Sequence, residues 1–131
     1  MQEERTMSAR TPEDVDRLFA EHMNAGNVDG VVGLYEPQAT FIPQTGALVT
    51  GAAAVREAIA GFAAMKPKLK MHITKTAKAG NDLAVLYNDW TATGVGPDGK
   101  SVDMKGRAIE IVRRQADGSW LFVLDDPFAR G

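Results

Sequence analysis

The sequence contains no cysteine, only 7% aromatic residues and no excess of one charge among its 131 residues. Without cysteine there is no disulfide, no thiolate metal site and no cysteine nucleophile. The net charge of −2 provides no basic surface, so we expect no nucleic-acid partner. No apolar run approaches a membrane span, and residues 1–10 lack the apolar centre of a signal peptide. We therefore expect a cytoplasmic protein that does not contact membranes.

What the sequence does have is 44% hydrophobic residues, enough for one buried core in one domain. The polar residues 1–10 predict a mobile N-terminal arm, and residues 11–131 predict a single domain. From residue 69 onward apolar residues recur with period two, which predicts four strands joined by turns. The expected fold class is therefore α+β, with helices followed by a long antiparallel meander. Helical spacing predicts helices over residues 11–27, 27–37 and 51–65, and short strands are expected at 39–42 and 47–50.

The stretch GVGPDG at residues 94–99 matches the G-x-G-x-x-G pattern of dinucleotide-binding loops. Such a loop leaves a strand and opens a helix, because the helix N-terminus receives the pyrophosphate. Here residues 101–114 alternate as a strand does, so the stretch predicts a turn. We therefore expect no dinucleotide and no other cofactor. The two histidines lie in different predicted elements without metal-ligand spacing, so no metal site is expected either.

Alternation along the predicted strands indicates which residues face the core. The even-numbered residues form an almost wholly apolar face, with Asn88, Glu110 and Asp126 as its polar exceptions. Buried polar groups cost roughly 1–3 kcal/mol when unpaired, so these three either pair with one another or line a cavity. The alternative is that they bond to loop backbone or lie beyond the rim of the core. The odd-numbered residues form a mixed surface that suits a homodimer interface.

His22 lies on the apolar face of the first predicted helix, directed at the same interior. It is either a core histidine with satisfied hydrogen bonds or, beside two carboxylates, a general acid or base. The candidate catalytic residues are therefore Glu110, Asp126 and His22. Asn88 is expected to orient a substrate, and the candidate pocket wall consists of Tyr35, Phe41, Trp90 and Phe122.

Two stretches resemble the nuclear transport factor two-like superfamily. Residues 27–59 contain a short helix ending in Leu-Tyr, a strand with Ala-Thr, a glycine turn and an Ala-rich helix. Residues 106–128 contain Gly-Arg, an alternating strand, Asp-Gly-x-Trp and a strand that closes on a polar pair. The order of elements agrees from about Thr11 to Phe128, and the chain is most similar to the branch of SnoaL-like and SgcJ/EcaC-type bacterial proteins.

The resemblance implies a cone-shaped, mostly antiparallel sheet wrapped around three helices (a cystatin-like roll), with an internal apolar pocket. It also implies a homodimer through the outer sheet face. Members include ketosteroid isomerases, dehydratases, cyclases and domains without catalysis. The chain departs from the isomerases, because Phe19 stands where they place a tyrosine, and Pro43 and Gln44 stand where they place the base.

The function expected from this resemblance is binding of a small apolar or aromatic ligand. If the protein is an enzyme, the resemblance implies cofactor-independent proton transfer, as in a polyketide cyclase, an isomerase or a dehydratase. Glu110 or Asp126 would then act as the acid or base, with a pKa raised by burial. The alternatives are a non-catalytic ligand-binding module and a structural dimerisation module.

Overall fold

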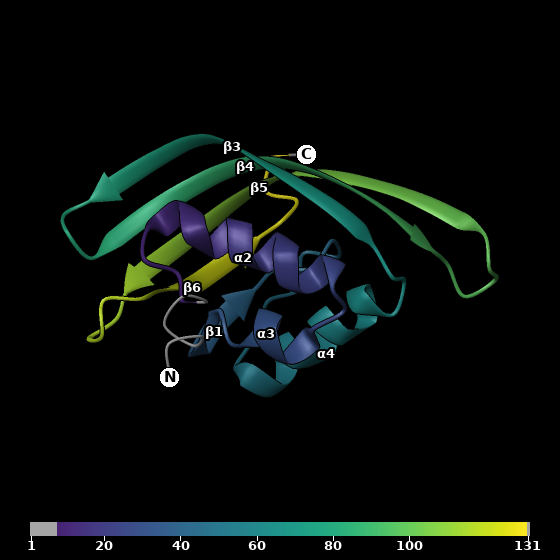
Figure 1. Ribbon diagram of the computed structural model, residues 1–131, viewed down its shortest axis with the longest axis horizontal. Helices are drawn as coiled ribbons and strands as arrows, with labels where there is room; N and C mark the ends of the chain where they lie inside the picture. Colours follow the sequence, from purple (N-terminus) through teal and green to yellow (C-terminus); the bar gives the residue numbers. More distant parts are fainter. Residues whose placement is uncertain (1–7, 131) are drawn as a thin grey trace.

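The structure is a computed structural model that describes residues 8–130. Its elements are labelled as in Figure 1. The helices are α2 (Pro12–Asn24), α3 (Val28–Val32) and α4 (Ala52–Ala63). The strands are β1 (Tyr35–Phe41), β2 (Val49–Thr50), β3 (Lys68–Ala79), β4 (Leu83–Val95), β5 (Ser101–Arg114) and β6 (Trp120–Asp126).

The strands form one sheet in the order β2-β1-β6-β5-β4-β3. All neighbours are antiparallel except β1 and β6, which are parallel. Figure 1 shows the long strands β3, β4 and β5 arching over α2, with α3 and α4 beneath it. The α+β class and the curved, mostly antiparallel sheet around three helices are therefore confirmed. The second helix is shorter than expected, because the chain already enters β1 at Tyr35.

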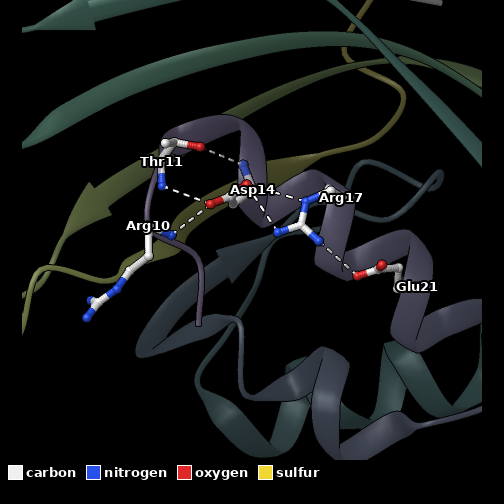
Figure 2. A network of polar contacts seen from close by, with 5 residues as sticks. All are labelled: Arg10, Thr11, Asp14, Arg17 and Glu21. Carbon is white, nitrogen blue, oxygen red and sulfur yellow. Dashed lines mark hydrogen bonds and ion pairs between the residues drawn. The ribbon is translucent and has the colours of Figure 1, made fainter. Parts of the chain in front are cut away.

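Helix α2 begins where the sequence predicts, because its first turn carries a complete capping box (Figure 2). Thr11 Oγ1 accepts a hydrogen bond from Asp14 N at 3.2 Å, and the Asp14 carboxylate accepts one from Thr11 N. The same carboxylate also accepts one from Arg10 N at 3.0 Å. Arg17 pairs with both Asp14 and Glu21 on the exposed side. These contacts fix the start of the helix that closes the concave side of the sheet.

Two residues of the predicted N-terminal arm, Ala9 and Arg10, contact the domain. Ala9 is buried, and its carbonyl oxygen accepts a hydrogen bond from Trp120 N at 2.9 Å. Arg10 donates to the carbonyl of Asp117 in the turn before β6. Residues 9 and 10 therefore pack on the domain, and residues 1–7 of the predicted arm lie outside the described residues.

The even-numbered residues of β4 and of the second half of β5 form the core face, as the alternation predicts. Leu86, Asn88 and Val112 are fully enclosed, and Glu110 is 2% exposed. Strand β6 breaks the alternation. Val112 pairs with Phe122, but Ile111 pairs with Leu124, so β6 carries one extra residue at this point.

Such a β-bulge reverses which side chains face inward beyond it. Phe122 lies in the core, but so does Asp125, which is 3% exposed, whereas Asp126 is only half-buried. The prediction that Asp126 occupies the inner face is therefore wrong by one residue. Asp125 takes that position, directly opposite Glu110 on β5.

Candidate functional site

A pocket of about 340 Å³ lies between α4 and the inner face of the sheet. Its size is near the lower end of the roughly 300–1,000 Å³ typical of small-molecule sites. Most of its lining is apolar, and two carboxyl groups, those of Glu110 and Asp125, interrupt it. The apolar lining is dominated by aromatic and methionine side chains: Phe19, Phe41, Phe62, Met65, Met71, Trp90, Met104 and Phe128.

A larger concavity of about 690 Å³ lies over the exposed side of the sheet. Charged side chains dominate it, and several of them pair with one another. Arg107 and Arg130, for example, both contact the Asp89 carboxylate, at 3.6 and 3.4 Å. Its polar lining is mostly exposed, whereas the 340 Å³ pocket is mostly apolar and contains two buried carboxyl groups, so that pocket is the better candidate site.

The two pocket acids belong to a buried polar cluster supplied by four strands and one helix. The phenol of Tyr35 on β1 donates to Asp125 Oδ2 at 2.5 Å. Asn88 on β4 donates through Nδ2 to Asp16 Oδ2 at 3.1 Å. Asp16 comes from α2, and a hydrogen bond joins its carboxyl to that of Glu110. The five side chains form the polar cluster behind the pocket.

Burial controls the protonation of the two pocket acids. Burial raises the pKa of Glu110 well above its ordinary value, and the charge of Asp16 and the hydrogen bond to it raise that pKa further. Burial also raises the pKa of Asp125 to about 7, although the hydrogen bond from Tyr35 lowers it and the charge of Asp16 raises it. Asp125 is therefore divided between its acidic and basic forms at neutral pH, and burial favours the protonated form of Glu110.

Asp16 and Tyr35, the other titratable groups of the polar cluster, have pKa shifts that agree with these protonation states. Burial raises the pKa of Asp16, but hydrogen bonds from Glu110 and Asn88 lower it, so Asp16 is the acceptor in the pair with Glu110. Burial and the nearby Asp125 raise the pKa of Tyr35 well above its ordinary value, so its phenol remains a donor. Asp16 Oδ1 and Glu110 Oε1 have no conventional donor among the described residues. A proton on Glu110 gives the two carboxyls a hydrogen bond that two ionised acids could not make.

Some of the residues predicted to form the pocket wall line the pocket, and others do not. Phe41 and Trp90 line the pocket directly. Tyr35 and Phe122 lie one layer deeper, with their rings packed together at a centroid distance of 4.8 Å. Asn88 is fully buried and holds Asp16 rather than contacting the pocket. The prediction that Tyr35, Phe122 and Asn88 line the pocket is therefore wrong, because none of the three is among the residues that line it.

His22 does not join the acids. It is buried between α2 and α3, where its Nδ1 lies 3.2 Å from Asn27 Nδ2. A methyl group on Gly30 would lie only 2.5 Å from that nitrogen, so the imidazole packs directly against the backbone of α3. His22 is a core histidine, and the hypothesis that it acts as the acid or base beside the carboxylates is wrong for this geometry.

Sequence reasoning missed two members of the cluster. Asp16 lies three residues before Phe19, a spacing that places both on one face of α2 and could have revealed it. Asp125 was one residue from the predicted Asp126, and no simple pattern signals the bulge that moves it inward. Within residues 8–130, no group of three histidine, aspartate or glutamate side chains is arranged to hold a metal ion. No helix in this same part of the chain is long and apolar enough to cross a membrane.

Comparison with known proteins agrees with this architecture. Residues 15–123 match the SnoaL-like domain family. No match was found among curated proteins. The chain therefore belongs to the SnoaL-like domain family, and its fold is that of the nuclear transport factor two-like superfamily.

Three solved structures illustrate how far the fold is shared. A ketosteroid isomerase-like protein from Erwinia carotovora atroseptica is 14% identical, with 87% of this chain and 89% of that chain covered and a TM-score of 0.77. A nuclear transport factor 2-like protein from Shewanella oneidensis is 18% identical, with coverages of 88% and 98% and a TM-score of 0.74. A protein with a cystatin-like fold from Caulobacter vibrioides is 14% identical, with coverages of 88% and 84% and a TM-score of 0.75. At these identities the likeness shows the fold alone.

Proposed function

We propose that this protein binds a small apolar or aromatic metabolite and catalyses cofactor-independent proton transfer on it. The observation that carries the proposal is the pair of acids in an otherwise apolar pocket. Asp125, with a pKa of about 7, lies opposite Glu110, whose protonated form is favoured by burial and by the neighbouring Asp16. Two carboxyls whose environments give them different protonation states are suited to separate acid and base roles.

The roles follow from these states. The ionised form of Asp125 accepts a proton from a carbon next to a carbonyl group, and the C–H electron pair moves into the enolate. When the ligand binds, the Glu110 O–H exchanges its hydrogen bond to Asp16 for one to the oxygen on which the negative charge develops. Return of the proton from Asp125 to the same or another carbon regenerates the carboxylate. Isomerisation, cyclisation and dehydration can all begin with this step.

The surroundings support such a step. Tyr35 holds one oxygen of Asp125 at 2.5 Å and thereby fixes the orientation of the base. The apolar lining limits the number of water molecules near the acids, which strengthens each electrostatic interaction inside the pocket. A pKa near the working pH gives a general base its best compromise between ionised fraction and proton affinity.

The test is hydrogen exchange on a bicyclic ketone. 2-Tetralone has acidic C–H groups beside its carbonyl, and its C1 proton signal disappears from the ¹H NMR spectrum in D₂O as exchange proceeds. We expect the wild type to accelerate this loss over buffer, and Asp125→Asn to reduce the acceleration by roughly 10²-fold or more. Glu57→Gln removes one carboxylate that is exposed on α4 and outside the pocket lining, so it is the matched control.

An unchanged exchange rate in Asp125→Asn would refute the role of Asp125 as base. If 2-tetralone raises the melting temperature of the wild type but no exchange is accelerated, the pocket binds without catalysis. That result would favour the non-catalytic ligand-binding module.

A further inference from the structure

The polar groups of the pocket are unbalanced in charge. Its lining contains two carboxyl groups, those of Glu110 and Asp125, and no lysine, arginine or histidine. Its other polar side chains are the Gln44 amide and the Trp90 indole, whose N–H already donates to the carbonyl of Pro127 at 2.8 Å. A ligand therefore meets acidic groups without any basic side chain beside them.

The elements packed around Asp125 supply no opposite charge either. Tyr35 faces it from β1, Asp16 acts on it from α2, Glu110 lies opposite it on β5, and Asp126 follows it on β6. These groups are acidic or, in the case of Tyr35, a neutral phenol. A positive charge brought into the pocket would meet no competing cation from these elements, whereas a negative charge would be repelled.

The rest of the lining also suits a cation. Aromatic faces attract ammonium groups through their quadrupoles, by about 0.5–1 kcal/mol when exposed and about 2 kcal/mol when desolvated. The thioethers of the methionines are polarisable and adapt to the shape of an apolar body. The pocket contains five aromatic side chains on five different segments: Phe19, Phe41, Phe62, Trp90 and Phe128.

We propose that the pocket selects a hydrophobic amine, whose ammonium group lies near Glu110 and Asp125 and whose apolar body occupies the aromatic lining. The proposal rests on the proposed binding pocket and names its ligand class. The ammonium group supplies a positive charge, which no side chain of the pocket lining provides. It also favours the ionised form of Asp125, which is the form that the proposed proton transfer uses. The same acidic groups repel ligands that carry a carboxylate.

The test compares three ligands that share one bicyclic skeleton and differ in charge. 2-Aminotetralin is cationic, 2-tetralol is neutral and 1,2,3,4-tetrahydro-2-naphthoate is anionic at neutral pH. Binding is followed by calorimetry with the full chain. We expect the amine to bind at least about tenfold more tightly than the alcohol, and the carboxylate to bind most weakly. In Asp125→Asn this preference for the amine should fall several-fold, whereas Glu57→Gln should keep it.

A second measurement needs no variant. Amine binding by the wild type should strengthen as the pH rises through about 7, because Asp125 ionises there while a primary amine stays protonated. Binding of the alcohol should change little or in the opposite direction. Equal affinity for amine and alcohol, or amine binding that is independent of pH, would overturn the inference.

The failure of this inference and the failure of the proposed function give different results. Tight binding of the neutral alcohol with no preference for the amine would refute the selection by charge, but it would agree with the proposed binding pocket. Accelerated exchange of 2-tetralone without binding of the amine would leave the catalytic proposal standing and refute the ligand class. If the protein prefers the amine but does not accelerate the exchange of 2-tetralone, the ligand class stands and the catalytic proposal is refuted.

Discussion

The substitution Asp125→Asn should remove a large part of the pH dependence of folding stability. Asp125 has a pKa of about 7 in the folded protein, against 3.8 as its ordinary value. Between these two values the folded state binds more protons than the unfolded chain, so the free energy of unfolding falls as the pH rises. Stability from this group is complete below about pH 4 and is lost as the pH passes through about 7.

The size of the effect follows from the same two values. One pKa unit corresponds to about 1.4 kcal/mol, so the wild type should lose up to about 4 kcal/mol through Asp125 between acidic and mildly alkaline pH. Glu110 acts in the same direction, because its pKa is also raised. Asparagine cannot ionise, but its side-chain oxygen can still accept the hydrogen bond from Tyr35. The variant should therefore have a flatter stability profile than the wild type.

Urea denaturation at a series of pH values, followed by tryptophan fluorescence, measures this profile. The wild-type and variant curves should converge below about pH 4 and separate as the pH rises to about 7, above which the variant should stay more stable by a constant amount. Glu57→Gln should follow the wild type, because Glu57 is exposed. Parallel curves for the wild type and Asp125→Asn would refute the assignment of a raised pKa to Asp125.

Two further substitutions test the packing and the coupling of the site. Gly106→Ala should destabilise the fold by roughly 1–3 kcal/mol in urea titrations. A methyl group at this position would lie 2.6 Å from both the Pro127 carbonyl oxygen and the Trp90 indole nitrogen. A stability equal to that of the wild type would contradict this packing. Asp16→Asn should lower the pKa of Glu110, since the charge of Asp16 is one of the causes that raise it, and ¹³C NMR of the glutamate carboxyl should show the change; an unchanged titration would mean that the two carboxyls are not coupled.

The fold could be predicted from the sequence because its signals are local. The capping box at Thr11 fixes the start of α2, and the alternation of residues 83–95 and 101–114 identifies β4, β5 and their core face. Glu110 could be found for the same reason, because it is a carboxylate on a strand face that is otherwise apolar. Each of these signals depends only on residues close in sequence.

The composition of the site could not be predicted in full, because it depends on contacts between distant segments. Asp125 faces inward only because β6 gains one residue against β5, and that bulge reflects the pairing of two strands rather than the sequence of one. Tyr35 reaches Asp125 through the parallel pairing of β1 and β6. His22 was correctly predicted to lie on the buried face of α2. Its imidazole packs on Gly30 of α3, however, and not beside the carboxyl groups.

Carboxyl titration by ¹³C NMR measures the pKa values of Asp125 and Glu110 themselves, with Asp125→Asn and Glu110→Gln used to assign the two resonances. We expect Asp125 to titrate near pH 7 and Glu110 to titrate well above its ordinary value of 4.5. Titration of both groups near their ordinary values of 3.8 and 4.5 would show that they are ionised together at neutral pH. That result would contradict the division of acid and base roles between them.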